Sequence, residues 1–190
     1  MNNRSYGCMS KVARLVLIPG LILFLAGVCP FAQAAETAKR AIPQGDLVFL
    51  PAHQLVDMIR TGKITSAELV EAYLAQIEKH NRKLNAIVTL DAEGARKRAR
   101  EADEAFKRGE IWGPLHGVPV TIKDNYATEG LKTTSSLPSL ADYVPKSDAT
   151  VVKRIRKAGA VILGKTHLPP MGLDVQSRSP LFGVTNNPWD

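Results

Sequence analysis

The chain has 190 residues, of which 45% are hydrophobic and 23% are charged. This length and composition are ordinary for one globular domain with a core, and they exclude a disordered or fibrous protein. The formal net charge is +7, and removing residues 1–34, which hold three basic and no acidic residues, lowers it by three to +4. That charge is spread among acidic residues, so we expect no nucleic-acid partner.

Residues 1–34 are predicted to be a secretory signal peptide, followed by a linker over residues 35–46. Three basic residues precede an apolar run at 15–28, and small residues then form a cleavage site, so we expect cleavage after Ala34 or Ala35. An uncleaved anchor is the alternative, but the run is shorter than the roughly 20 residues that a spanning helix needs. We therefore expect an exported protein, periplasmic or secreted, with no stable membrane anchor.

Both cysteines of the chain, Cys8 and Cys29, lie in this predicted signal peptide. Cleavage after Ala34 would remove them, so we expect neither a disulfide nor cysteine chemistry in the processed protein. Cys29 also raises the alternative of a lipoprotein signal, although the bulky Val28 stands where a small residue is expected.

Two helices are predicted at the start of the processed chain. The first covers residues 50–60 and is ended by Gly62. Thr65 and Glu68 have the spacing of a capping box. The apolar residues after them recur at helical spacing, which predicts a second helix that ends near Asn81.

The middle of the chain is predicted to contain two strands around a charged helix. A short strand is expected at 84–90, and a helix at 92–108 with a narrow apolar stripe of Ala95, Ala99, Ala102 and Phe106. The strand at 118–122 is apolar and β-branched, which is typical of a strand buried on both faces. A polar loop is then expected at 128–143.

The last predicted elements are a helix and a strand. Ser147 or Asp148 is expected to cap the helix, Gly159 to close it, and residues 160–163 to form the strand. A strand, a helix and a second strand in this order favour parallel strands joined by a crossover helix. The predicted fold class is therefore α/β, with helices covering a sheet.

Lys123 is the candidate catalytic residue, because it ends the apolar strand at 118–122. If that position is buried, the loss of water disfavours the charged ammonium and lowers the pKa of the lysine. Such a lysine can accept a proton near neutral pH and act as a general base. The alternative is that Lys123 lies in water just beyond the end of the strand.

The remaining polar residues give weaker indications. The four histidines lack metal-ligand spacing, so no metal and no cofactor are expected. His116 and His167 could line a cleft or be hydrogen-bonded loop residues. Gly-Lys-Thr at 164–166 imitates a phosphate loop, but a predicted strand precedes it and prolines follow it, so we set it aside. Ser135 and Ser136 could hold a nucleophile or be ordinary loop residues.

Several blocks of sequence between residue 47 and the end of the chain together resemble the amidase signature family of serine hydrolases. The blocks are Gly-Lys-Ile-Thr-Ser (62–66), Glu-Leu (68–69), Asn-Ala (85–86), Gly-Pro-Leu-His-Gly-Val-Pro-Val-Thr-Ile-Lys-Asp-Asn (113–125), Thr-Thr (133–134), Asp-Ala (148–149), Ala-Gly-Ala-Val-Ile-Leu-Gly-Lys-Thr (158–166), Pro-Leu-Phe-Gly (180–183) and Asn-Pro-Trp (187–189). The resemblance implies an α/β/α fold around a mixed sheet, of which residues 47–190 would be an incomplete, amino-terminal part.

The resemblance also implies a catalytic apparatus. It assigns Lys123 to a triad of a nucleophilic serine, a bridging cis-serine and a lysine. It places Met171, Gly172 and Leu173 in the lining of an acyl channel, although Met171 could instead be plain packing. In the family both serines follow the Asn-Pro-Trp block in a Gly-Ser-rich segment. The 190 residues contain no such segment, so we expect no meaningful activity from this chain alone.

Three functions remain open at this point. The leading hypothesis is an exported amidase without a cofactor, which hydrolyses a small-molecule amide to an acid and ammonia or an amine. The alternative is a truncated, non-catalytic product or binding module. The third is the amidotransferase branch of the family, which supplies ammonia to a partner acting on charged transfer RNA; the export signal argues against it. The sequence does not indicate which amide is cleaved and leaves a homo-oligomer open.

Overall fold

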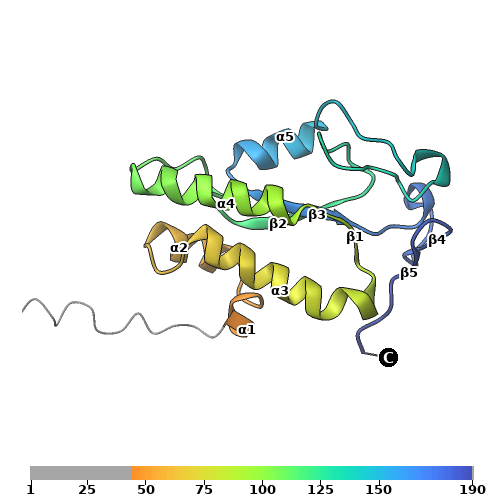
Figure 1. Cartoon of the computed structure of the whole chain (residues 1–190), viewed down its shortest axis with the longest axis horizontal. Helices are drawn as coiled ribbons and strands as arrows, with labels where there is room; N and C mark the ends of the chain where they lie inside the picture. Colours follow the sequence, from red (N-terminus) through yellow and green to blue (C-terminus); the bar gives the residue numbers. More distant parts are fainter. Residues whose placement is uncertain (1–43, 190) are drawn as a thin grey trace, which may run out of the picture. The chain divides into compact units, whose positions relative to one another are not determined.

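The computed structural model of this protein describes residues 44–189, which form a single unit (Figure 1). The predicted signal peptide at 1–34 and most of the predicted linker lie outside these residues. Within residues 44–189, none of the helices has both the length and the apolar character that crossing a membrane requires.

Helices occupy most of the first half of the described range, whereas the second half consists mainly of loops, with short strands and the helix α5. The helices are α1 (Gln44–Leu47), α2 (Ala52–Arg60), α3 (Ser66–Leu84), α4 (Ala92–Lys107) and α5 (Thr150–Lys157), with 3-10 turns η1 (Pro138–Leu140) and η2 (Pro170–Gly172). The strands are β1 (Ile87–Leu90), β2 (Pro119–Lys123), β3 (Val161–Thr166), β4 (Arg178–Ser179) and β5 (Gly183–Val184).

The main sheet is mixed and has the strand order β1-β3-β2. β3 lies in the centre, antiparallel to β1 and parallel to β2. The helix α5 connects β2 to β3, so the parallel pair expected from the sequence is confirmed. β4 and β5 form a separate antiparallel pair.

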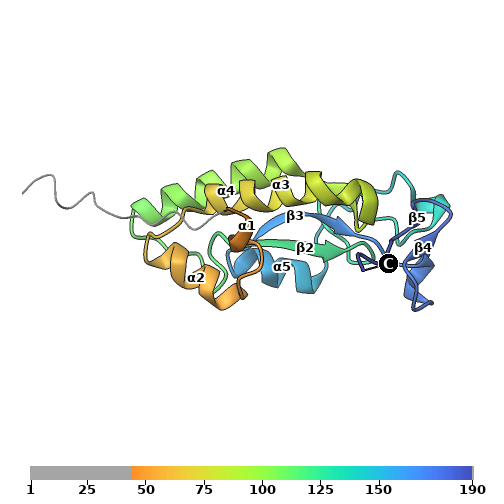
Figure 2. The same ribbon diagram turned by 90° about the horizontal axis from the view of Figure 1, so that it is seen from below.

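Helices cover both faces of this sheet, as the two views in Figures 1 and 2 show. On one face, Val70 of α3 and Ala99 of α4 pack in the same cluster as Val161 of β3. On the other face, Val152 of α5 packs against Ile122 of β2 and a neighbouring residue of β3. The result is an α/β/α arrangement in which apolar residues of β3 are buried from both sides.

The start of α3 has the capping box that the sequence predicts. The side chain of Thr65 accepts a hydrogen bond from the backbone of Glu68, and the Glu68 carboxylate accepts one from the backbone N–H of Thr65. The helix continues to Leu84, three residues beyond the expected end at Asn81, and Asn85 closes it in the left-handed conformation with φ 56°. Asparagine tolerates that conformation better than most residues do.

Small residues allow α3, α4 and the residues just before β2 to lie close together. Gly117 has φ +73°, and a Cβ atom at this position would lie 2.8 Å from the Cβ of Ser66. The hydroxyl of Ser66 donates a hydrogen bond of 2.7 Å to the carbonyl of Gly117. On α4, four alanines are at most 1% exposed: Ala95, Ala99, Ala102 and Ala105. The first three belong to the expected apolar stripe, whereas its fourth member, Phe106, is only half-buried.

Three sequence-based expectations about the second half are wrong. β2 is not buried on both faces: Ile122 is buried, but Thr121 is exposed, because β2 lies at the edge of the sheet. The N-cap of α5 is Ala149 without a side-chain hydrogen bond, since the Asp148 carboxylate instead accepts from Glu129 N and from Arg156. The final strand does not end at residue 163 but continues to Thr166.

Candidate functional site

The candidate site lies at the carboxyl-terminal edge of the parallel strands β2 and β3. Their register pairs Lys123 with Thr166, and the backbone N–H of Asp124 extends the pairing with a 3.0 Å hydrogen bond to the carbonyl of Thr166. In open α/β sheets, ligands bind beyond this end of the strands. The polar residues that follow both strands are therefore well placed to form a site.

Lys123 lies at this edge, but its surroundings differ from those expected. Its side chain is exposed within the described residues. The carbonyl of Lys123 accepts a 3.0 Å hydrogen bond from the backbone of Tyr126, which closes a turn directly after β2. The physical argument from burial therefore fails for Lys123 in this chain, and the alternative of a lysine in water describes it. Its catalytic role rests on the family resemblance and stays a prediction.

The buried lysine of this site is Lys165, which is fully enclosed at 0% exposure. Its ammonium donates hydrogen bonds of 2.7 Å to the carbonyl of Tyr126 and 2.8 Å to the hydroxyl of Thr133. It also lies 3.8 Å from a carboxylate oxygen of Asp124. Burial lowers the pKa of Lys165 from 10.5 to about 8, against the opposing effect of the carboxylates of Asp124 and Asp148.

Sequence reasoning missed Lys165 because it placed the end of β3 too early. With a strand that stops at residue 163, Gly-Lys-Thr at 164–166 falls in a loop. In the structure these residues belong to β3, whose burial continues through Lys165. What identifies it is the register of the parallel pair, in which the six residues of β3 lie beside the five of β2, with an irregularity between Val120 and Thr121, and Lys165 lies opposite Ile122.

Asp124, directly after Lys123, is also completely buried. One carboxylate oxygen, Oδ2, accepts hydrogen bonds of 3.1 Å from the backbone N–H and 2.5 Å from the hydroxyl of Thr134. The other, Oδ1, has no hydrogen-bond partner among the described residues. The ammonium of Lys165 at 3.8 Å is its compensating charge.

Ser135 and Ser136 lie beside Asp124 in an unusual backbone conformation. Both are left-handed, with φ 49° and 57°, and Met171 nearby has φ 56°. Ser135 N donates to the carbonyl of Asp124 at 3.2 Å, and Met171 N donates to the carbonyl of Ser135 at 3.0 Å. Left-handed residues other than glycine carry strain, and such strain gathers at functional sites. Ser136 itself is buried and donates to the carbonyl of Leu168 at 2.6 Å, so it is not in an ordinary surface loop.

The predicted substrate-contacting residues lie on η2 and just after it. Met171 is 61% exposed and Leu173 is 82% exposed. Met171 is thus not packed in the core of the described residues, and both its contact with substrate, together with Gly172 and Leu173, and its alternative role in plain packing stay predictions.

The two candidate histidines are hydrogen-bonded structural residues. His116 is buried; its Nδ1 accepts from the backbone N–H of Trp112 at 3.1 Å, so its Nε2 donates to the carbonyl of Ala102 at 3.1 Å. Burial lowers the pKa of His116, which favours this neutral form. His167 bonds to the hydroxyls of Thr185 and Ser179 at 2.7 and 3.1 Å, and burial lowers its pKa as well. The hydrogen-bonded alternative is thus correct for both.

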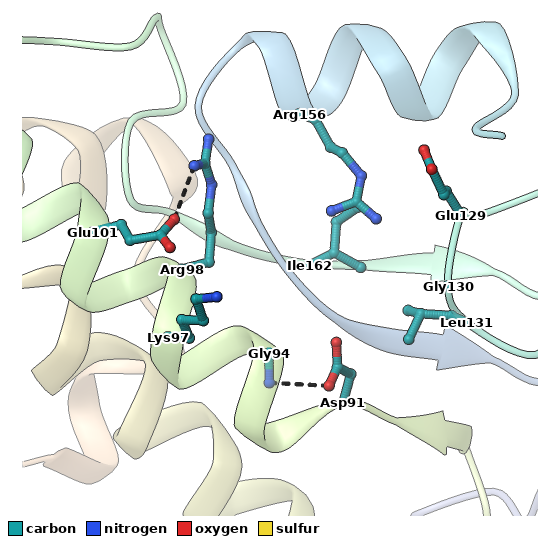
Figure 3. Close-up of a pocket in the computed structure, with 10 residues that line it drawn as sticks. All are labelled: Asp91, Gly94, Lys97, Arg98, Glu101, Glu129, Gly130, Leu131, Arg156 and Ile162. Atoms are coloured by element: carbon teal, nitrogen blue, oxygen red, sulfur yellow. Dashed lines mark hydrogen bonds and ion pairs between the residues drawn. The ribbon is translucent and has the colours of Figure 1, made fainter. Parts of the chain in front are cut away.

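A cavity of about 310 Å³ lies between α4, β3 and α5, away from these residues (Figure 3). Neither Lys123 nor η2 contributes to its lining. Its three acidic and three basic side chains balance: Asp91, Glu101, Glu129, Lys97, Arg98 and Arg156. This cavity offers no surplus charge for an ionic ligand. Within residues 44–189, no cluster of acidic, histidine or cysteine side chains could hold a metal ion.

Comparisons with a family model and with individual known proteins indicate the same family. The model of the family described as Amidase matches residues 68–190. Over 145 residues the chain is 43% identical to a glutamyl-tRNA(Gln) amidotransferase subunit of Moorella thermoacetica. It is 41% identical to the corresponding protein of Streptomyces coelicolor, which bears the same name. These alignments include 76% of this chain but only 30% and 29% of the two relatives, so the chain spans less than a third of their length.

Solved structures agree with the fold described above. A fatty acid amide hydrolase superposes with a TM-score of 0.73 at 26% identity, over 77% of this chain and 26% of that one. A peptide amidase from Stenotrophomonas maltophilia gives 0.71 at 32% identity, over 78% of this chain and 31% of that one. The expected α/β/α fold with a mixed sheet is therefore confirmed, and the chain matches part of that fold.

Proposed function

This chain belongs to the amidase family, and from that premise we propose that it forms part of an enzyme that hydrolyses a carboxylic amide to an acid and ammonia or an amine. The observation that carries the proposal is the position of Lys123 at the carboxyl-terminal edge of the sheet, in the longest sequence block shared with the family. The neighbouring strained backbone of Ser135 and Met171 supports a functional site at this edge.

The proposed mechanism uses a serine nucleophile, a bridging cis-serine and Lys123. The neutral amine of Lys123 accepts the proton of the bridging serine, which takes the proton of the nucleophile as that oxygen attacks the amide carbon. The C–N bond then breaks, the proton returns to the departing nitrogen, and water hydrolyses the acyl-enzyme ester. No metal or cofactor takes part in this proposal.

The proposal assigns neither serine to residues 1–190, because these hold no Gly-Ser-rich block like that of the family. It also requires Lys123, whose side chain is exposed within the described residues, to be enclosed in the active enzyme. The exposed side chains of Met171 and Leu173 would then line the acyl side of the substrate site.

The proposed location is outside the cytoplasm. Its support is the predicted signal peptide with cleavage after Ala34 or Ala35. Sequencing the amino terminus of the protein isolated from the host that carries it tests this. A start at residue 35 or 36 supports export, and a start at Met1 refutes it.

A second candidate function is that of a glutamyl-tRNA(Gln) amidotransferase component. The observation that favours it is the 43% and 41% identity to proteins that bear this name, which gives it more weight than the sequence alone did. In this role the same amide chemistry would supply ammonia to a partner. Cytoplasmic fractionation together with co-purification of partner proteins would favour it, whereas release of the protein from the periplasm would favour the exported amidase.

The test of the amidase proposal measures ammonia or amine release from a panel of aliphatic, aromatic and peptide amides. We compare the natural protein isolated from its host with a Lys123→Met variant produced at the same locus. Lys153→Met, at an exposed position of α5, is the matched control. We expect Lys123→Met to abolish release and Lys153→Met to retain it. Equal activity of the natural protein and Lys123→Met would refute the assignment of Lys123.

A further inference from the structure

Lys165 is a fully buried cation that the proposed mechanism does not use. It belongs to the central strand β3, and its register partner Ile122 directly precedes Lys123. Burying an ammonium is costly unless its donors are satisfied. Here hydrogen bonds to Tyr126 and Thr133 satisfy two of its three protons, and the third can face the Asp124 carboxylate at 3.8 Å.

The groups that Lys165 contacts lie in two segments around the candidate site. Asp124 and Tyr126 belong to the turn that begins with Lys123, and Tyr126 N closes that turn on the carbonyl of Lys123 at 3.0 Å. Thr133 begins the loop that contains the strained Ser135. Lys165 therefore adds a second link between the turn after β2 and this loop, beside the hydrogen bonds that Thr134 and Ser135 donate directly to Asp124.

We propose that Lys165 is a positioning residue for the amide hydrolysis proposed above: its buried ammonium fixes the Asp124–Tyr126 turn against the Thr133–Ser136 loop and thereby sets the direction of Lys123. This inference rests on the proposed function. Lys165 does not reach the reacting atoms in this role, because it is completely enclosed. It acts through the backbone of its neighbours.

The charge of Lys165, and not only its volume, is required by the geometry. Asp124 Oδ1 is buried and has no hydrogen-bond partner among the described residues, so the ammonium is the compensation nearest to it. Without that ammonium, Asp124 Oδ1 would be buried with neither a hydrogen bond nor a nearby positive charge, and the carboxylate would be drawn toward water. That movement would disturb the bonds from Thr134 and Ser135 to Asp124.

The kinetic test uses Lys165→Met, which keeps the length of the side chain and removes its charge, in the natural full-length protein. Displacement of a reacting group by about 1 Å costs on the order of 10²-fold in rate. We expect kcat to fall by about that factor while KM changes less than about twofold, since substrate contacts are untouched. Lys153→Met on α5 should match the natural protein. An unchanged kcat, or a loss confined to KM, would overturn the proposal.

A second readout does not depend on activity. In Lys165→Met, amide hydrogen exchange should accelerate at Tyr126 and Ser135 while α3 amides keep their protection. Equal acceleration throughout the chain would indicate a general loss of stability and would overturn the positioning role, as would unchanged exchange at those two amides. If the natural protein hydrolyses no amide, the exchange rates still show whether Lys165 fixes the turn against the loop. Failure of the proposed function can therefore be distinguished from failure of the proposed role of Lys165.

A third measurement covers the case in which Lys165→Met does not fold. In the natural protein, amide NMR signals of Tyr126 and Thr134 should shift together as the pH is raised from 7 to 9.5, following loss of the Lys165 proton. The charged or titratable groups that face Lys165 are Asp124 and Asp148, with His167 beside Asp124. Signals of these two amides that stay constant over this range would overturn the proposal.

Discussion

The lowered pKa of Lys165 predicts that the stability of the protein rises with pH above neutrality. Burial lowers the pKa of this lysine from 10.5 to about 8. Below pH 8 both the native and unfolded states are protonated, and the cost of burying the charge is fully present. Between pH 8 and 10.5 the unfolded chain binds more protons than the native state, so the free energy of unfolding increases with pH. Above 10.5 the cost has disappeared.

The magnitude follows from the two pKa values. At about 1.4 kcal/mol for each pKa unit, the difference between 10.5 and about 8 corresponds to about 3 kcal/mol. Burial also raises the pKa of Tyr73, which lowers stability with pH near the top of this range. The pH dependence of stability measured for the natural protein alone would therefore contain both effects. Subtracting the curve of Lys165→Met removes the contribution of Tyr73.

The assay is urea unfolding followed by circular dichroism at pH 7.5, 8.5, 9.5 and 10.5. We expect the free energy of unfolding of the natural protein to gain about 3 kcal/mol relative to Lys165→Met across this range. Lys153→Met should behave as the natural protein does. Parallel curves for the natural protein and Lys165→Met would refute the reasoning, because they would mean that Lys165 has the same proton affinity in both states.

The other predictions concern packing, capping and a close approach of the backbone. Leu69→Ala removes a fully buried side chain and should lower the free energy of unfolding, measured in urea, by about 2 to 5 kcal/mol. Leu173→Ala, at an 82% exposed position, should lower it by less than about 0.5 kcal/mol. Equal losses in the two variants would contradict the described core. Thr65→Ala removes the capping box and should cost about 1 kcal/mol, read as a lower midpoint of thermal unfolding. Gly117→Ala places a Cβ atom 2.8 Å from that of Ser66 at φ +73°, and should lower the free energy of unfolding by more than about 1 kcal/mol. An unchanged midpoint of thermal unfolding would show that the backbone around Gly117 moves away from Ser66 at no cost.

The sequence predicts the helices well because their signals are local. The capping box of Thr65 and Glu68 can be read from neighbouring residues and is confirmed, and three of the four residues expected in the apolar stripe of α4 are buried. The burial of strands is not local. β2 is apolar, but its exposure depends on whether another strand lies beside it, and within the described residues it is at the edge. Apolar composition alone does not contain that information.

The candidate site shows the same difference between what neighbouring residues predict and what depends on distant segments. The resemblance identifies the Lys123 block, and the structure places it at the edge of the sheet where sites form. The physical argument, a lysine with a lowered pKa in a buried position, is valid but applies to Lys165. What decides between two lysines near strand ends is the register of β2 against β3. Register depends on pairing between segments about 40 residues apart, and single-sequence periodicity does not determine it.

The alanine stripe of α4 has a consequence for how the protein tolerates mutation. Because Ala95, Ala99, Ala102 and Ala105 are at most 1% exposed, methyl groups set the thickness of the layer between α4 and its neighbours. A larger side chain at Ala95 or Ala99, which pack in one cluster with Val161 and Leu163, would push the helix outward and shift β3 with it. Substitutions on a helix far from Lys165 would thus reach the candidate site through the strand that carries it, and random mutagenesis should find these alanines among the least replaceable residues of the chain.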